Sequence, residues 1–285
     1  MAWNSPYVVT PAWLAAHLED PNLAILDGSW HLPPENRDAV AEFAQRHIPG
    51  AQFFDINTIA DVASGLPHML PLDAQFADAA GAMGIGNATR VIVYDTKGLF
   101  SAARVWWTFR VMGHENVAIL DGGFPAWLAA GLPTEIGPAR QRPRQTFTAR
   151  RNTALVRSMS DVRGLIGAEP TQLVDARPAP RFTGAQPEPR PGLTQGHIPG
   201  ARNVPFTELL NADGTLKSEA DLRAALAAAG VDAAKPVVAS CGSGVTASMV
   251  ALALALLGRN DTAVYDGSWA EWGRDAANPV ATGRA

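Results

Sequence analysis

The stretch Val237-Val-Ala-Ser-Cys-Gly-Ser-Gly-Val-Thr-Ala247 predicts a strand, a tight loop and a helix in immediate succession. A short apolar run leads into Cys241, which is the only cysteine in the 285 residues. The two glycines around Ser243 favour a turn, and the alanine- and leucine-rich segment that follows favours a helix. Strand, loop and helix in this order form the repeating unit of α/β folds with parallel sheets.

Cys241 lies where a negatively charged sulfur atom is favoured. A thiol at the end of a strand, facing a glycine loop and the start of a helix, meets backbone N–H groups and the positive end of the helix dipole. Both stabilise the thiolate, which is the reactive form of cysteine. The alternative is a buried, unreactive thiol. Flanking glycines and a serine are unusual neighbours for a core residue, which favours the reactive interpretation.

Composition narrows the class of protein. A length of 285 residues suits two domains, and an apolar fraction of 47% supports a sizeable core. The net charge of −4 argues against nucleic acid or an anionic membrane as a partner. A single cysteine permits neither an intramolecular disulfide nor a thiolate metal cluster, so we expect no metal and no other cofactor.

The sequence favours a soluble, cytoplasmic protein. The stretch Met1-Ala-Trp-Asn-Ser-Pro6 lacks the basic and apolar blocks of a signal peptide. The longest apolar run, from Ala247 to Leu257, is too short to cross a bilayer. We therefore expect no association with a membrane.

The two halves of the chain repeat four blocks in the same order, which indicates an internal duplication. Apolar strands that alternate with helices predict an α/β fold, with a mainly parallel sheet in each half and helices on both of its faces. The matched blocks are Leu23–Asp27 with Gln172–Asp175, His47–Ala51 with His197–Ala201, Val91–Asp95 with Pro236–Cys241, and Ile119–Trp127 with Ala263–Trp272.

The duplication sets the expected domains. We expect an N-terminal domain at residues 1–137, a linker at 138–152 and a C-terminal domain at 153–285. The linker is rich in proline and arginine, which is typical of a surface connector. Its basic run would also suit nucleic acid, but the net negative charge of the chain argues against nucleic-acid binding. Asp95 aligns with Cys241, so we expect only the C-terminal domain to be catalytic.

Two of the repeated blocks resemble a known family. Gly196-His-Ile-Pro-Gly-Ala201 and Asp266-Gly-Ser-Trp269 are similar to recurrent blocks of the two-domain rhodanese-type sulfurtransferases, and the resemblance covers nearly the whole chain. It implies two tandem rhodanese-like domains. It also implies that Cys241 attacks a small-molecule sulfur donor, becomes a persulfide, and passes the sulfur to a thiol, a thioredoxin-type protein or cyanide.

The loop Cys241-Gly-Ser-Gly-Val-Thr246 resembles the branch of this family that uses 3-mercaptopyruvate and releases pyruvate. Thiosulfate sulfurtransferases typically carry arginine and lysine directly after the cysteine, where this chain has Gly242 and Ser243. A neutral loop suits the monoanion 3-mercaptopyruvate better than the dianion thiosulfate. The resemblance implies that the loop contacts substrate through four residues: Gly242, Gly244, Val245 and Thr246.

A neutral loop requires another group to hold the substrate carboxylate. Arg181 and Arg190, on a proline-rich stretch, are similar in position to the substrate-binding arginines of the mercaptopyruvate branch. A guanidinium group binds a carboxylate through two parallel hydrogen bonds, which orients the substrate as well as attracting it. The alternative is a pair of surface arginines near Glu188.

The resemblance also implies a proton relay in which Ser243 joins a histidine and an acidic residue. The histidine matches His68, in Leu66-Pro-His-Met-Leu-Pro71, but Asn57 stands where the acidic residue is expected. Asparagine can orient an imidazole, yet it cannot stabilise an imidazolium by charge. A purely structural role for His68 therefore stays open.

Three other functions compete with sulfur transfer from 3-mercaptopyruvate. A cysteine phosphatase requires an arginine six positions after the cysteine, where this chain has Ala247. A non-catalytic binding module would more plausibly resemble the half that carries Asp95. Thiosulfate:cyanide sulfurtransferase remains the alternative within the enzyme class.

Asp27 and Asp175, at matched strand ends, are expected to bind nearby backbone or arginine.

Overall fold

The computed structural model describes residues 3–284, which form two compact units. The first contains residues 3–61, 70–152 and 210–216, and the second contains 62–69, 153–209 and 217–284. Residues 138–152 thus group with the first unit, and the second half begins at residue 153. The expected domain limits stay a prediction, but two short segments clearly group with the unit formed mainly by the other half of the chain.

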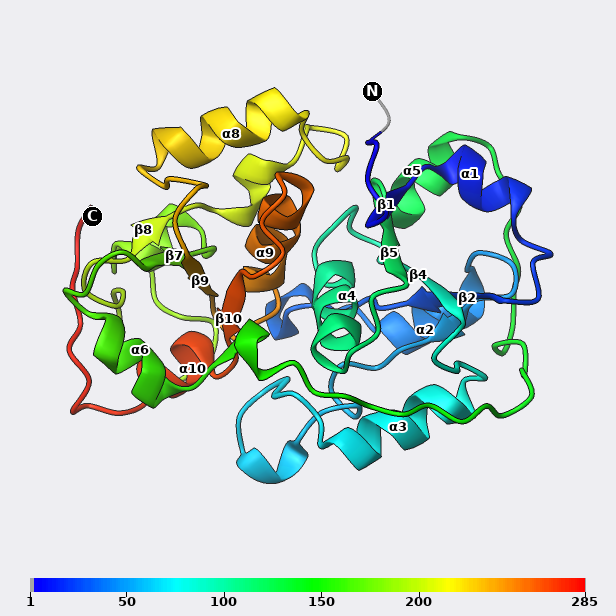
Figure 1. Ribbon diagram of the computed structural model, residues 1–285, viewed down its shortest axis with the longest axis horizontal. Coiled ribbons are helices and arrows are strands. Elements are labelled where there is room, and N and C mark those ends of the chain that lie inside the picture. The colour runs from blue at the N-terminus through cyan, green and yellow to red at the C-terminus, as the bar shows by residue number, and fades with distance from the viewer. Residues whose placement is uncertain (1–2, 285) are drawn as a thin grey trace. The chain divides into compact units, whose positions relative to one another are not determined.

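The first unit is built on a sheet of five parallel strands in the order β1-β5-β4-β2-β3. Figure 1 labels β1, β5, β4 and β2 of this sheet. Strand β2, one of the two five-residue strands of this sheet, is buried along its whole length, as expected for a strand covered on both faces. The strands are β1 (Val8–Val9), β2 (Leu23–Asp27), β3 (Gln52–Phe53), β4 (Arg90–Tyr94) and β5 (Val117–Leu120).

Helices pack on both faces of this sheet. Alternate residues of β2 and β4 lie in one cluster with side chains of α1, α2 and α5. On the other face, Val105 of α4 lies beside Val93 of β4, and Phe76 of α3 packs edge-on against Phe109 of α4. The helices are α1 (Pro11–Ala16), α2 (Ala39–Gln45), α3 (Asp73–Ala82), α4 (Ala102–Val111) and α5 (Gly123–Ala129), with a 3-10 turn at η1 (Pro33–Glu35).

The second unit repeats this topology position by position, with the parallel strand order β6-β10-β9-β7-β8. The expected α/β class, with a parallel sheet in each half, is therefore confirmed. The strands are β6 (Val156–Arg157), β7 (Gln172–Asp175), β8 (Arg202–Asn203), β9 (Val237–Ser240) and β10 (Ala263–Tyr265).

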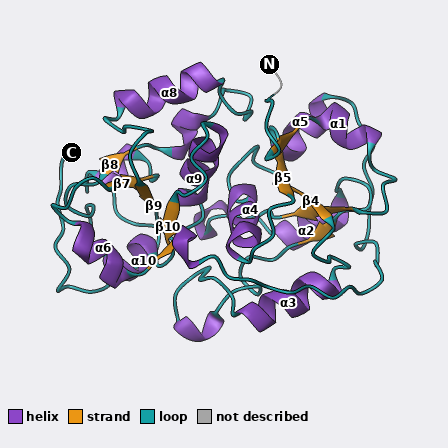
Figure 2. Ribbon diagram, viewed as in Figure 1, coloured by secondary structure: helices purple, strands orange, loops and turns teal. Residues whose placement is uncertain are grey.

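Helices also flank the second sheet (Figure 2). Val162 of α6 and the tryptophans Trp269 and Trp272 of α10 share a buried cluster with Leu173 and Val238 of the sheet. Helix α9 contacts β9 and β10. The helices are α6 (Met159–Leu165), α7 (Ala179–Phe182), α8 (Glu219–Ala228), α9 (Ala247–Leu256) and α10 (Ser268–Trp272), with 3-10 turns at η2 (Val62–Ser64), η3 (Thr153–Leu155) and η4 (Phe206–Leu209).

Two further features concern the length of the helices and the ion pairs of the 138–152 segment. Within residues 3–284, no helix combines the length and the apolar character that crossing a membrane would require. Arg144 pairs with Asp78, and Arg151 pairs with Asp73 at 2.6 Å. These two ion pairs join the 138–152 segment to acidic residues of the first unit.

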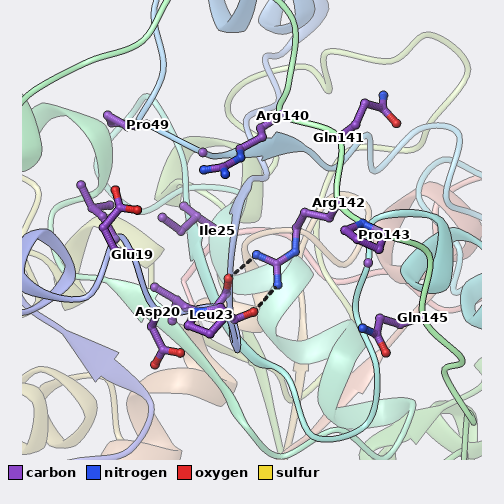
Figure 3. A pocket seen from close by; sticks show the side chains of 14 residues that line it. Glu19, Asp20, Leu23, Ile25, Pro49, Arg140, Gln141, Arg142, Pro143 and Gln145 are labelled. Carbon is purple, nitrogen blue, oxygen red and sulfur yellow. Dashed lines mark hydrogen bonds between the residues drawn. The ribbon is translucent and has the colours of Figure 1, made fainter.

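A cavity of about 390 Å³ lies in the first unit, beside the start of β2 (Figure 3). Arg142 reaches along it and donates hydrogen bonds to the carbonyl oxygens of Leu23 at 2.5 Å and Pro21 at 2.9 Å. Its lining includes Glu19 and Arg140 but no residue of the Cys241 loop. The cavity therefore marks where the 138–152 segment is held against the first sheet.

Asp27 and Asp175 end matched strands but have different side-chain partners. Asp175 accepts hydrogen bonds from the Arg177 guanidinium at 2.6–3.1 Å. At the matching position the first unit has Ser29, whose backbone N–H donates to Asp27 at 2.9 Å. Burial raises the pKa of Asp27 from its ordinary value of 3.8 to about 6, against the opposing effect of the Ser29 hydrogen bonds. Asp175 also accepts the backbone N–H of Arg177 at 2.9 Å. The expectation of backbone or arginine partners is confirmed for both residues.

Asp27→Asn is expected to become more stable relative to wild type as the pH rises from acid to neutral. Since folding raises the pKa of Asp27, its contribution to stability is present below pH 3.8 and is lost as pH rises through about 6. A shift of this size corresponds to about 3 kcal/mol. Urea unfolding measures the difference in the free energy of unfolding between Asp27→Asn and wild type. This difference should increase by up to about 3 kcal/mol between about pH 4 and about pH 8. The matched change at exposed Glu19, Glu19→Gln, should show no such increase, and a constant difference for Asp27→Asn would contradict the assignment.

Candidate active site

Cys241 follows β9 and begins the loop that leads into α9. The residue is 2% exposed. The carbonyl oxygens of Cys241 and Gly242 accept hydrogen bonds from the backbone N–H groups of Trp269 and Ala270, both at 2.9 Å. The start of α10 therefore holds the carbonyl side of the loop and fixes the backbone around the thiol.

A second set of contacts to α10 comes from Ser268. Its Oγ accepts hydrogen bonds from the backbone N–H groups of Cys241 at 3.2 Å and Gly244 at 3.1 Å. The same hydroxyl donates to the carbonyl oxygen of Tyr265 at 2.8 Å. One buried hydroxyl thus ties both ends of the turn to β10.

The matching loop of the first unit shows which ligand such a backbone binds. Oδ2 of Asp95 accepts hydrogen bonds from three consecutive N–H groups at the start of α4, those of Phe100, Ser101 and Ala102, at 2.7–2.9 Å. A carboxylate of the chain itself therefore fills an anion cradle at a helix N-terminus.

Cys241 occupies the position of Asp95 in the second unit. Helix α9 spans ten residues, and the Thr246 side chain makes no capping hydrogen bond at its start. By comparison with the first unit, N–H groups at the start of α9 would face a negative charge carried by Cys241. The loop residues Gly244, Val245 and Thr246 lead into this helix, and their role in binding stays a prediction.

His68 lies against Ser243. Its Nδ1 and the Ser243 Oγ share a buried hydrogen bond of 3.0 Å, in which the imidazole tautomer decides the donor. The short segment 62–69 carries His68 into the second unit, which also contains the Cys241 loop. His68 has a φ of 61°, a left-handed conformation that is uncommon outside glycine and is found at functional sites.

Arg181 and Arg190 both lie next to the residue that follows Cys241. A β-carbon on Gly242 would be 3.0 Å from Nη2 of Arg181 and 3.9 Å from Nη1 of Arg190. The Arg181 side chain is 13% exposed, so it is not a surface arginine. Burial lowers the pKa of Arg190, and the charge on Cys241 opposes that shift, but a guanidinium group stays protonated at physiological pH.

Glu188, which the surface alternative would have left exposed, is buried and holds Arg181 in place. Its side chain is 3% exposed. Oε2 accepts from Nη2 of Arg181 at 2.5 Å, and Oε1 accepts from Nε of Arg181 at 3.2 Å and from Nη1 of Arg177 at 2.8 Å. Arg177 in turn binds Asp175 at the end of β7. Because β7 pairs with β9, this network lies beside the strand that leads to Cys241.

The model of the rhodanese-like domain matches residues 10–130 and 158–275. The chain belongs to the rhodanese family. Both matches lie within the two repeats, so the expected tandem rhodanese-like domains are confirmed. The predicted resemblance is also confirmed by relatives that align over most of their length and of this chain.

Named rhodanese relatives include enzymes for both sulfur donors. The chain is 47% identical over 271 residues to 3-mercaptopyruvate sulfurtransferase of Rattus norvegicus, which covers 93% of this chain and 91% of the relative. It is 46% identical over 272 residues to thiosulfate sulfurtransferase of Bos taurus, with 93% and 91% covered. Overall identity therefore does not separate the donors.

A rhodanese crystal structure agrees with the fold. SseA from Escherichia coli, a 3-mercaptopyruvate sulfotransferase, matches with a TM-score of 0.85 and 42% sequence identity. The match covers 93% of this chain and 99% of that chain. The whole two-domain architecture is thus shared with a solved member of the rhodanese family.

Asn57 differs from the acidic residue expected in the relay of the family. It lies in the first unit, is exposed, and its backbone N–H donates to Asp55 at 2.8 Å. Its part in a relay with His68 stays a prediction. The second unit thus contains five of the predicted site residues: Cys241, Ser243, His68, Arg181 and Arg190. Asn57 lies in the first unit.

Sequence reasoning missed Ser268 as a residue of this rhodanese site. Its φ is 50°, and the matching residue of the first repeat is Gly123, with a φ of 56°. A serine where the repeat otherwise uses glycine was an available signal, because such a backbone favours glycine. The serine is explained by its hydroxyl, which accepts the N–H groups of Cys241 and Gly244.

Ser268→Gly is expected to destabilise the protein by about 1–3 kcal/mol, since two buried N–H groups lose their acceptor. Glycine suits the positive φ, so the change isolates the loss of the hydroxyl. Urea unfolding measures the effect. The control is Ser248→Ala, which removes a buried hydroxyl that only donates to the Gly244 carbonyl oxygen and should cost less. Wild-type stability in Ser268→Gly would contradict the anchoring role.

Proposed function

We propose that the chain is a sulfurtransferase that takes sulfur from 3-mercaptopyruvate through a persulfide on Cys241. The observation that carries this proposal is the pair of guanidinium groups, from Arg181 and Arg190, beside the uncharged Gly242. This arrangement offers a fork for one carboxylate next to the nucleophile and adds no basic side chain from the loop itself. Names of relatives support sulfur transfer with small-molecule donors.

The reaction begins with the Cys241 thiolate attacking the sulfur of 3-mercaptopyruvate. A sulfur–sulfur bond forms and the carbon–sulfur bond of the donor breaks, and its electron pair leaves on carbon as the enolate of pyruvate. The thiol proton of the donor is transferred to that carbon. The products are therefore pyruvate and the Cys241 persulfide anion, with no external oxidant or reductant. N–H groups at the start of α9 are suited to stabilise both sulfur anions.

Ser243 and His68 are proposed to move the proton. Their hydrogen bond of 3.0 Å lets the serine hydroxyl exchange a proton with the imidazole while it contacts the donor.

The second half-reaction transfers the outer sulfur to an acceptor and returns Cys241 to the thiolate. We propose a small thiol or a thioredoxin-type protein as the acceptor, with cyanide as a laboratory substitute, in the cytoplasm. The 153–285 segment would serve as the catalytic domain, after the 1–137 domain and the 138–152 linker.

The proposal predicts a clear preference for 3-mercaptopyruvate over thiosulfate. Both donors should be assayed on one purified sample with cyanide as the acceptor, and kcat/KM compared. We expect 3-mercaptopyruvate to be preferred by at least about tenfold, because the loop supplies no second positive charge for a dianion. A preference for thiosulfate would overturn the choice of donor and support the alternative that the bovine relative represents.

A further inference from the structure

A cluster of five charged residues, three of which have buried side chains, includes the two arginines that lie beside Gly242. We call it the guanidinium cluster; it consists of Asp175, Arg177, Arg181, Glu188 and Arg190. Three guanidinium groups and two carboxylates give it a net charge of +1. The side chains of Asp175, Arg177 and Glu188 are 1–3% exposed, so water screens their charges poorly.

Glu188 has two separate effects within this cluster. It accepts hydrogen bonds from Nε and Nη2 of Arg181, which fixes the plane of that guanidinium group. These contacts occupy one edge of the guanidinium and leave its Nη1–Nη2 edge for a substrate carboxylate. In addition, its negative charge cancels one positive charge close to where the sulfur donor must bind.

We propose that Glu188 sets donor specificity: it positions Arg181 for a carboxylate, and its negative charge weakens the binding of a dianionic donor more than that of a monoanionic one. The inference rests on the proposed function of the Cys241 site. Coulomb energy is proportional to ligand charge, so a carboxylate near the donor repels a dianion twice as strongly as a monoanion at the same place. Glu188 thus disfavours thiosulfate more than 3-mercaptopyruvate.

The test is the donor ratio, defined as kcat/KM for thiosulfate divided by kcat/KM for 3-mercaptopyruvate, with cyanide as the acceptor for both. In Glu188→Gln this ratio is expected to rise on the order of tenfold over wild type, because the cluster gains one net positive charge. The control, Glu208→Gln, removes a carboxylate of the same unit whose side chain is 64% exposed, and should keep the wild-type ratio. If Glu188 were only structural, both kcat/KM values would fall by the same factor and the ratio would stay constant.

Glu188→Gln leaves Arg177 with one buried partner fewer, so its folding needs a safeguard. The triple variant Asp175→Asn/Arg177→Gln/Glu188→Gln removes the buried ion pairs together, a type of change that proteins often tolerate. Its reference is the double variant Asp175→Asn/Arg177→Gln, which retains Glu188 and the net charge of +1. The triple variant should show the higher donor ratio, and equal ratios in the two would refute the proposal.

The outcome for Glu188 is distinct from the outcome for the proposed function. A wild-type preference for thiosulfate would refute the proposed donor, whatever the variants show. A wild-type preference for 3-mercaptopyruvate, with a donor ratio that Glu188→Gln leaves unchanged, would refute only the role of Glu188.

Discussion

Replacement of Cys241 by serine is expected to abolish sulfur transfer while the protein stays folded. A serine hydroxyl cannot form the persulfide, and removal of a catalytic nucleophile lowers turnover by at least about 10⁴-fold. The contacts that hold residue 241 use its backbone: the N–H donates to Ser268 and the carbonyl oxygen accepts from Trp269. The loop should therefore keep its conformation in the variant.

Steady-state assays with 3-mercaptopyruvate test this expectation, and thermal unfolding serves as the control for folding. Cys241→Ser should lose activity and melt within a few degrees of wild type. Cys241→Ala should behave in the same way, which would exclude a new hydrogen bond of the serine as the cause. Residual turnover near the wild-type level in either variant would show that another group accepts the sulfur.

Ser243→Ala is expected to lower kcat with 3-mercaptopyruvate by about 10²-fold, the lower end of the contribution of general acid–base catalysis. Ser243 is 4% exposed and His68 is 5% exposed, so water is poorly placed to replace the hydroxyl. The reason for the loss is the proton that must leave the donor thiol as the enolate forms.

The pair can be tested as a unit with His68→Asn, since asparagine tolerates the left-handed φ of 61°. If Ser243 and His68 share one relay, each single variant and the double variant should lose nearly the same factor in kcat. If the loss in kcat of the double variant equals the product of the two single losses, the two residues act independently. A wild-type kcat in Ser243→Ala would show that the serine takes no part in proton transfer.

Much of the fold follows from local patterns in the sequence. Thr10 and Pro11 predict the start of α1, and the Thr10 side chain does accept a hydrogen bond from the N–H of Trp13. The matched blocks of the two halves predict two similar sheets, and the strand orders coincide. These features can be predicted from the sequence because they depend on residues a few positions apart or on the similarity between the two halves of the chain.

Other parts of the site depend on contacts between distant segments and have no local pattern. Residues 62–69, which carry His68, and residues 210–216 group with the unit formed mainly by the other half of the chain. Ser268 acts on N–H groups more than twenty positions away. Glu188 looked like a neighbour of surface arginines, and only the fold shows that it is buried.

The site residues also differ in how far the sequence alone could define them. Cys241, Arg181 and Arg190 follow from a family pattern, and the structure adds their shared proximity to Gly242. Asp95 was expected to mark a non-catalytic copy. Its hydrogen bonds to the start of α4 add a physical reason, because the carboxylate already fills the place of an anionic ligand.

The central claim is that sulfur from 3-mercaptopyruvate is carried on Cys241. The most direct measurement is the intact mass of the protein after brief exposure to 3-mercaptopyruvate without an acceptor. Because Cys241 is the only cysteine, a single added sulfur atom that a thiol reductant removes identifies the persulfide site. We predict this mass increase in wild type, with release of pyruvate, and none in Cys241→Ser. An unchanged wild-type mass while pyruvate is released, or a sulfur adduct that persists in Cys241→Ser, would contradict the account.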